Sequence, residues 1–378
     1  MSRKKVIIIG SAYPFRGGGI STFNERLAYA YQEEGHDVTI YTFSLQYPSI
    51  FFPGTTQYSQ EPPPENLNIK IRINSINPLN WVKIGNEIKR LKPDLVLVRF
   101  WIPFMAPCLG TICRIIRKAG INVVAITDNI IPHERKPLDR ILARYFVGSV
   151  GYFVTMSRSV LKDLESFDRT KPKKLTVHPL YDNFGEPVPK DEALSRLKLR
   201  KDYKYVLFFG FIREYKGLDL LLKAFAHPEI RKLPVRLIVV GEFYVDPEPY
   251  LKIISENKIE DLVILKTEFI PNTEVVYYFC ASSLVVQPYK DATQSGITQV
   301  AFHFNKPMIT TNVGGLSEIV IDGKVGYIVN PDSDEIARSV LNYFKLDKEE
   351  TFSENIKEEK KKFAWSTMID AVDEVLNK

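Results

Sequence analysis

The stretch P-Y-K-D-A-T-Q-S-G-I-T-Q-V-A-F-H-F-N-K-P-M-I-T-T-N-V-G-G-L-S-E, residues 288–318, decides the fold. An apolar run, Ser283 to Gln287, precedes it and is typical of a buried parallel strand. The pattern then predicts a helix from Gln294 to Phe304 and a second short strand from Pro307 to Thr311. A Gly-Gly turn follows, and a further helix is predicted from Leu316 to Asp322.

The turn before this helix carries four small or polar residues, Thr293, Gln294, Ser295 and Gly296. The first amides of a helix have no partner within the helix and lie at its positive dipole end, so they can bind an anion. These four residues fall where the amides should point. The alternative is an ordinary turn, because Ser and Thr also cap helices.

Strand-like apolar runs alternate with helical patterns throughout the chain, in two similar halves. Strands are expected at 6–9, 38–42, 69–73, 95–99, 123–127, 152–156 and 175–178, and then at 205–209, 236–240, 262–266, 284–287, 308–311 and 326–329. This alternation predicts an α/β fold with two doubly wound parallel sheets. Residues 182–204, rich in Pro, Gly and charge, are interpreted as the linker.

The predicted domains are residues 1–186 and 203–350, followed by C-terminal helices within 351–378 that return to the first domain. Two such domains facing each other would place a ligand at the carboxyl ends of both sheets. Candidate functional residues are therefore sought immediately after strands.

The chain has 378 residues and a net charge of +6. Residues 1–190 hold 26 Lys and Arg against 16 Asp and Glu, a net +10, whereas residues 191–378 have 25 against 29, a net −4. The basic half indicates an anionic partner, either a phosphate-bearing substrate, an anionic membrane surface or nucleic acid. No recognition helix or RNA motif supports nucleic acid, so we expect none.

Three cysteines in apolar surroundings, Cys108, Cys113 and Cys280, form neither a disulfide framework nor a zinc site, which favours the reducing cytoplasm. The apolar run Val6 to Ile9 is too short for a signal peptide. The longest segment without charge, Phe100 to Cys113, is shorter than the roughly 20 residues that span a bilayer. We expect a cytoplasmic protein, with peripheral attachment to the inner membrane face as a further hypothesis.

Two loops in the first half have residues suited to ligand binding. Gly17, Gly18 and Gly19 precede a helix and allow a ligand to approach the backbone, although they match neither the dinucleotide fingerprint nor the P-loop. The alternative is a flexible loop without contacts to ligand. His133 lies on a loop after a strand, where an imidazole can bind a hydroxyl or a phosphate.

Two cations follow the first strand of the second half. Arg213 and Lys216 come just after Gly210 and before a helix. An Arg fork together with a Lys point charge suits a diphosphate, whereas the alternative is an ordinary surface pair.

The motifs together resemble glycosyltransferase family 4, whose members have the GT-B fold. The resemblance rests on Phe209-Gly210 through Arg213, Lys216-Gly217, the helix LDLLLKAF, Val240-Gly241-Glu242, Gly314-Gly315-Leu316-Ser317-Glu318, the Gly-rich first loop, Gly35-His36-Asp37-Val38, Met156-Ser157, and Phe363 with Trp365. It covers essentially the whole chain. It implies a retaining hexosyltransferase of cytoplasmic polysaccharide biosynthesis, which uses a nucleotide sugar and needs no metal or other cofactor.

The resemblance also implies roles for individual residues. The catalytic residues would be Arg213 and Lys216, which would bind the donor diphosphate, and His133, which would contact the donor sugar or the acceptor near the reacting centre. The remaining donor-binding residues would be Gly17, Gly18, Gly19, Glu242, Asp291, Thr293, Gln294, Ser295, Gly296 and Gln299. Asp332-Ser333-Asp334 looks like the metal motif of another glycosyltransferase fold, but its place at a helix start predicts a cap.

The chain departs from the family at its pair of glutamates eight residues apart. Aligned on Pro288 and Pro307, the two positions fall on Ala292 and Val300, and a shift by one gives Asp291 and Gln299. We expect polar substitutes rather than an inactive enzyme, but a non-catalytic protein that binds sugar nucleotides is the alternative. For the acceptor, aromatics between Gln46 and Gly54 indicate a glycan or a lipid-linked molecule, and the alternative is that Ile50 and Phe51 pack on the fold.

Overall fold

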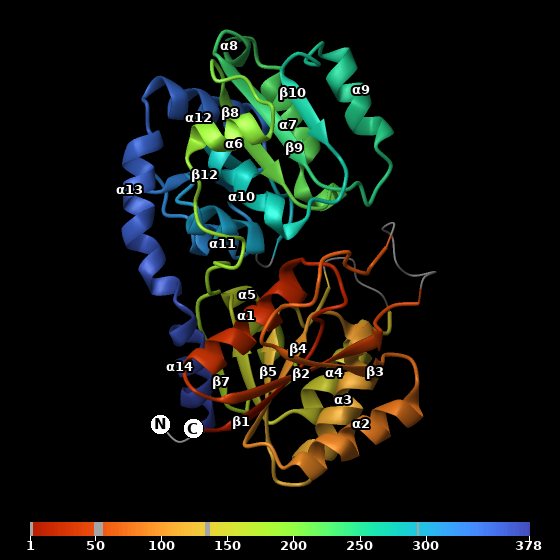
Figure 1. Cartoon of the computed structure of the whole chain (residues 1–378). Helices are drawn as coiled ribbons and strands as arrows, with labels where there is room; N and C mark the ends of the chain where they lie inside the picture. Colours follow the sequence, from red (N-terminus) through yellow and green to blue (C-terminus); the bar gives the residue numbers. More distant parts are fainter. Residues whose placement is uncertain (1–2, 49–55, 133–136, 293–294) are drawn as a thin grey trace. The chain divides into compact units, whose positions relative to one another are not determined.

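A computed structural model describes residues 3–48, 56–132, 137–292 and 295–378. The chain forms two compact units, Met1–Pro179 with Phe363–Lys378, and Leu180–Lys362. Figure 1 shows both units as sheets covered by helices. The residues interpreted as a linker fall within the second unit, and the C-terminal segment is divided between the two units at Phe363.

The first unit has seven strands in the order β3-β2-β1-β4-β5-β6-β7, and every pair is parallel. The strands are β1 Lys5–Ile9, β2 Asp37–Leu45, β3 Asn68–Asn74, β4 Leu95–Phe100, β5 Asn122–Thr127, β6 Tyr152–Thr155 and β7 Lys173–Leu175. The helices are α1 Gly19–Glu33, α2 Pro78–Leu91, α3 Ala106–Arg117, α4 Asp139–Ser149, α5 Arg158–Glu165 and α14 Trp365–Leu376, with a 3-10 turn η2 Pro103–Met105. The strand order reverses between β1 and β4, which is where doubly wound sheets bind ligands.

The second unit repeats this plan with six parallel strands in the order β10-β9-β8-β11-β12-β13. The strands are β8 Lys204–Phe209, β9 Val235–Val240, β10 Val263–Lys266, β11 Leu284–Gln287, β12 Met308–Thr311 and β13 Gly326–Val329. The helices are α6 Lys190–Arg196, α7 Leu218–Phe225, α8 Pro228–Arg231, α9 Glu248–Glu256, α10 Asn272–Ala281, α11 Gly296–His303, α12 Ser333–Lys345 and α13 Glu349–Glu359, with 3-10 turns η3 Glu214–Lys216, η4 Leu316–Glu318 and η5 Lys360–Phe363. The reversal lies between β8 and β11.

The central strands are apolar on both faces because helices cover both sides of each sheet. All six residues of β4 are buried, and so are all four of β11. Each unit has its own hydrophobic core, which confirms the prediction of two doubly wound α/β sheets.

Two predicted elements differ from the structure. The expected helix over residues 316–322 is only the turn η4, because the β-branched run Ile319 to Ile321 disfavours a helix and Gly323 interrupts the segment. The strand expected at 175–178 lies earlier, at β7. Helices α4 and α5 lie between strands, where helical patterns were expected without stated bounds.

The last helix, α14, packs on the first unit, as expected for the C-terminal segment. The Trp365 ring lies 4.9 Å from the Phe23 ring of α1, and Arg26 lies over its face at 5.4 Å. Asp373 forms a 2.9 Å ion pair with Lys4, beside the start of β1. In the part of the chain that the structure describes, no helix is long and apolar enough to cross a membrane.

Candidate functional site

In the second unit, the loops after β8 and β9 are paired side by side. The amide of Ile212 donates to the carbonyl of Glu242 at 2.8 Å, and the amide of Tyr244 donates to the carbonyl of Ile212 at 2.9 Å. Arg213 therefore lies next to the loop of Glu242, and its guanidinium covers the Tyr244 ring at 5.2 Å. Gly241 allows this approach, because a Cβ there would come within 2.3 Å of the Gly210 carbonyl.

Lys216 ends the short turn η3 and is held by a glycine. Gly217 has φ 66°, and a Cβ at this position would lie 2.0 Å from the Pro288 carbonyl oxygen, so another residue would displace the turn. The Lys216 ammonium covers the Tyr289 ring at 5.5 Å. Lys216 Nζ also lies 3.1 Å from the position that a Cβ on Gly210 would occupy.

The Lys216 side chain is only half-buried, but its ammonium lies among protein atoms. Burial lowers the pKa of Lys216, and the nearby charge of Arg213 lowers it further, whereas Tyr215 opposes the shift. Among the described residues, no carboxylate lies within 4 Å of the Lys216 or Arg213 side-chain nitrogens. Two neighbouring cations without an anion favour a ligand that has negative charge.

The start of α11 lies beside these cations. A Cβ placed on Gly210 would lie 3.7 Å from the side chain of Ile297, which is in the first turn of α11. The Lys216 ammonium approaches the same point. Ser295 occupies the N-cap position but does not cap the helix with its side chain. Its Oγ instead accepts from Gln287 Nε2 at 2.6 Å and lies 3.4 Å from the Tyr289 hydroxyl. The alternative of an ordinary turn predicted that the Ser295 side chain caps α11, and it does not. The amides at the start of α11 therefore remain suited to binding an anion.

The other predicted residues of this unit have contrasting positions. Asp291 is exposed, whereas Gln299 is fully buried and both of its amide atoms lack a hydrogen-bond partner. Ala292 and Val300, at the unshifted family positions, are buried apolar residues. Thr293 and Gln294 lie outside the described residues. The structure thus groups Arg213, Lys216, Glu242, Ser295 and Gly296 at one edge of the sheet, with Asp291 in the same loop as Ser295.

In the first unit, Gly17, Gly18 and Gly19 lead into α1 at the carboxyl edge. The Gly18 amide donates to Thr22 Oγ1 at 3.1 Å, and Ser21 Oγ donates to the carbonyl of Arg16 at 2.7 Å. A Cβ at Gly18 would meet no atom within 4 Å, so the loop leaves open space there. His133, predicted as catalytic, lies outside the described residues.

A buried ion pair that the sequence did not reveal lies beneath this loop. Arg99, the fifth residue of β4, forms two hydrogen bonds to Asp128, which follows β5, and Arg99 Nε donates at 2.6 Å. The guanidinium stacks on the Phe23 ring of α1 at 3.5 Å. Arg99 therefore joins the helix that follows the glycines to the loop that leads to His133. Only an isolated Arg at the end of an apolar strand indicated it in the sequence.

Two further ionisable groups of this region have shifted pKa values. His178 packs on Phe23 at 5.3 Å, and burial, with the charge of Arg99, lowers its pKa to about 3. Glu25, on α1, accepts from the Tyr13 amide at 2.7 Å, and burial raises its pKa to about 7, with a further contribution from Glu61.

Changing His178 to Gln is expected to make the protein less sensitive to acid. The folded pKa is about 3, below the roughly 6.5 of the unfolded chain, so the unfolded state takes up the proton first. The unfolding free energy contributed by His178 therefore falls between about pH 6.5 and about pH 3, by at most about 1.4 kcal/mol per pH unit. Urea denaturation at several pH values measures this slope.

Glu25→Gln is the matched control with the opposite sign. Glu25 has a folded pKa of about 7, above its ordinary 4.5, so its contribution to stability is lost as the pH rises through this window. The unfolding free energy of the Glu25→Gln variant should therefore fall more steeply with decreasing pH than that of the parent protein. Equal slopes in both variants and in the parent protein would contradict the assignment.

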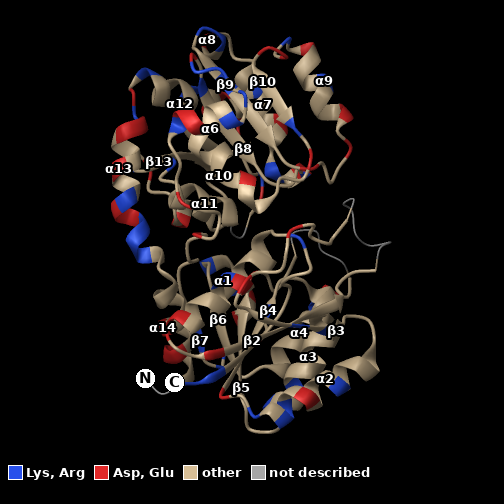
Figure 2. Cartoon of the chain, viewed as in Figure 1, with Lys and Arg blue, Asp and Glu red and all other residues tan. Residues whose placement is uncertain are grey.

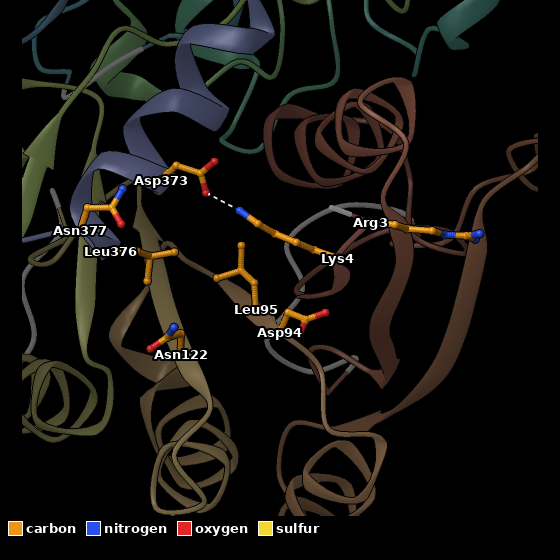
Figure 3. A pocket seen from close by; sticks show the side chains of 8 residues that line it. All are labelled: Arg3, Lys4, Asp94, Leu95, Asn122, Asp373, Leu376 and Asn377. Atoms are coloured by element: carbon orange, nitrogen blue, oxygen red, sulfur yellow. Dashed lines mark hydrogen bonds and ion pairs between the residues drawn. The ribbon is translucent and has the colours of Figure 1, made fainter. Parts of the chain in front are cut away.

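Figure 3 shows a hollow of about 440 Å³ in the first unit, at the opposite edge of the sheet. It lies at the amino ends of β4 and β5, beside α14, and the ion pair between Lys4 and Asp373 crosses it. Its lining is Arg3, Lys4, Asp94, Leu95, Asn122, Asp373, Leu376 and Asn377. No predicted site residue lines it, so we do not assign the ligand site there.

Asp332 confirms the prediction of a cap, because its carboxylate accepts from the amides of Asp334 and Glu335 at 3.0 Å each. Across the described residues, no group of three or more His, Cys, Asp or Glu is placed to hold a metal ion.

Comparison with known proteins agrees with this geometry. The sequence model of "Glycosyltransferase Family 4" matches residues 17–180, and that of "Glycosyl transferases group 1" matches residues 203–345. The chain belongs to glycosyltransferase family 4. The two matches cover every strand of the second sheet and all strands of the first except β1, and they confirm the resemblance inferred from the motifs.

Curated relatives of this family-4 chain share part of their length with it. It is 31% identical over 164 residues to a D-inositol 3-phosphate glycosyltransferase of Catenulispora acidiphila, which covers 41% of this chain and 39% of that protein. It is also 31% identical over 178 residues to an uncharacterized glycosyltransferase of Methanocaldococcus jannaschii, covering 46% and 48%. The chain spans less than half the length of these relatives.

Solved structures show that the family-4 chain has the GT-B fold. Sucrose-phosphate synthase from Thermosynechococcus elongatus has a TM-score of 0.75 at 17% identity, covering 99% of this chain and 98% of that chain. HepE of Anabaena, solved with UDP and glucose, has a TM-score of 0.74 at 16% identity, covering 99% and 100%. The fold predicted from the sequence is therefore confirmed.

Proposed function

We propose that this chain is a hexosyltransferase that moves a sugar from a nucleotide sugar to a glycan or lipid-linked acceptor. The observation that carries the proposal is the pair of cations Arg213 and Lys216 beside the start of α11, which have no carboxylate partner among the residues that the structure describes. A diphosphate has the charge and the size to use both cations and the helix amides together. HepE of Anabaena, which shares the fold, was solved with UDP and glucose, which favours a nucleotide-sugar donor.

We propose that transfer proceeds with retention and without a metal. Arg213 and Lys216 would stabilise the charge that develops on the leaving diphosphate, which is the role a metal has in other enzymes. A leaving phosphate oxygen would then accept the proton of the acceptor hydroxyl on the same face of the sugar. His133 would contact the reacting centre, and Glu242, Asp291, Thr293, Gln294 and Gln299 would complete the donor site.

Binding of the right nucleotide sugar is expected to raise the melting temperature of the protein. Ligands stabilise the folded state as their concentration exceeds the dissociation constant. A thermal-shift screen with UDP-, GDP- and ADP-sugars identifies the donor. The assay is repeated with EDTA, and NMR of the product gives its anomeric configuration. The absence of a shift with every nucleotide sugar would contradict the proposal.

The second candidate is a non-catalytic protein that binds sugar nucleotides. The apolar residues Ala292 and Val300 at the family's acidic positions favour it. The enzyme should slowly release free sugar from the bound donor. A protein that only binds sugar nucleotides should give the same thermal shift without this hydrolysis.

A further inference from the structure

The helices α2 and α4 of the first unit expose apolar side chains at their starts. Leu79, in the first turn of α2, is 82% exposed, and Ile141, in the first turn of α4, is 65% exposed. Ile76, Val82 and Leu138 are exposed beside them. We call these five residues the apolar rim. Single exposed apolar residues are ordinary on a protein surface, but several at the starts of two helices of one unit are typical of an interaction site.

The rim runs along one edge of the unit. Helices α2, α3 and α4 pack side by side as one layer over the sheet (Figure 1). Because α2 follows β3 and α4 follows β5, both helices begin at the carboxyl ends of parallel strands. The apolar rim therefore lies at the same edge of the sheet as the Gly-rich loop that precedes α1.

Basic residues lie along α2, where Figure 2 colours several segments of the helix blue. Lys83, Lys89 and Arg90 are exposed, and within the described ranges none of their side chains has an ion pair. Glu87, the acid on this helix, instead binds Arg72 at 3.0 Å and accepts from the Tyr41 hydroxyl at 2.9 Å. Leu79, Lys83 and Arg90 recur at helical spacing, so apolar and basic groups share the outer face of α2.

The start of α4 has the same combination. Arg140 and Arg144 are exposed next to Leu138 and Ile141. Arg140 covers the Phe167 ring at 5.2 Å, and among the described residues Arg144 has no ion pair. Exposed apolar groups flanked by cations are typical of a surface that lies in the headgroup region of an anionic bilayer.

We propose that the apolar rim and the cations beside it dock this unit on an anionic lipid bilayer. Leu79, Val82 and Ile141 enter the boundary of the acyl chains, while Lys83 and Arg90 contact the headgroups. Docking would hold the carboxyl edge of the sheet near the membrane, where a lipid-linked acceptor, as proposed above, is found. The docking itself does not depend on glycosyl transfer.

Vesicle flotation with the full chain tests this proposal. We expect the protein to float with phosphatidylcholine vesicles that contain about one-third phosphatidylglycerol, and not with phosphatidylcholine alone. Raising the salt to about 0.5 M should release it, because screening weakens attraction between exposed charges and headgroups. The Leu79→Ser/Val82→Ser variant should lower the bound fraction about tenfold. The Lys83→Glu/Arg90→Glu variant should abolish the dependence on anionic lipid.

Leu251→Ser is the matched control, because Leu251 is exposed (41%) on α9 of the second unit. It should bind vesicles like the parent protein, and all variants should keep the parent melting temperature. They should also keep the thermal shift with a nucleotide sugar, so a loss of docking is separable from a failure of the proposed function. Salt-insensitive binding, or no binding by the parent protein, overturns the proposal. A dimer that the Leu79→Ser/Val82→Ser variant dissociates also overturns it, since a second copy would then be the partner.

Discussion

Replacing Lys216 with alanine is expected to lower turnover at least tenfold, which is about 1.4 kcal/mol of transition-state stabilisation. The ammonium lies among protein atoms beside Gly210 and the first turn of α11, so its charge acts more strongly on a leaving diphosphate than it would in bulk water. The loss should be smaller than that of a covalent nucleophile, because Arg213 and the helix amides remain. Initial rates with the donor found by thermal shift measure the effect.

The same variant should not lose stability without ligand. The Lys216 ammonium has no carboxylate partner among the described residues, and burial lowers its pKa, so removing it relieves a desolvation cost. The donor-induced thermal shift should shrink in parallel with turnover. Lys252→Ala, which removes an exposed lysine paired only with Glu256, should change neither quantity. Unchanged turnover in Lys216→Ala would remove this residue from the site.

The fold was predictable because its pattern is local and repeated. Apolar runs of four to six residues, most of them followed by a helical pattern, specify parallel strands wherever helices cover both faces. The exceptions also have local causes. The β-branched run after Leu316 reduced a predicted helix to the turn η4.

The candidate site of the second unit was predictable for a similar reason. Arg213 and Lys216 follow β8 directly, and Ser295 with Gly296 begins the helix after β11, which pairs with β8. In a parallel sheet, neighbouring strands end at the same edge, so adjacency of these groups follows from the strand order. The spacing of residues does not predict that Ser295 Oγ binds Gln287 instead of capping α11. It also does not predict that Gln299 is buried.

The polar groups of the first unit could not be predicted. Arg99, Asp128, Phe23 and His178 come from four separate elements, and their contacts depend on tertiary packing. Their pKa shifts arise from burial, which the sequence does not give. These residues nevertheless join α1 to the start of the loop that follows β5.

Replacing Arg99 with methionine is expected to destabilise the protein by about 3–5 kcal/mol. The change leaves the Asp128 carboxylate without its cation in a buried setting, although methionine keeps a contact with the Phe23 ring. Asp128→Leu should cost a similar amount, because it leaves the Arg99 guanidinium unpaired. Urea denaturation gives both unfolding free energies.

The double variant Arg99→Met/Asp128→Leu distinguishes stability from positioning. A buried ion pair replaced by apolar residues of similar size is often neutral, so most of the lost stability should return. Turnover should not return, because Arg99 no longer links α1 to the loop that follows β5. A stable double variant with parent turnover would show that the pair serves folding alone. If the loss of unfolding free energy in the double variant equals the sum of the losses in the two single variants, the two groups do not interact, because coupled partners deviate from additivity.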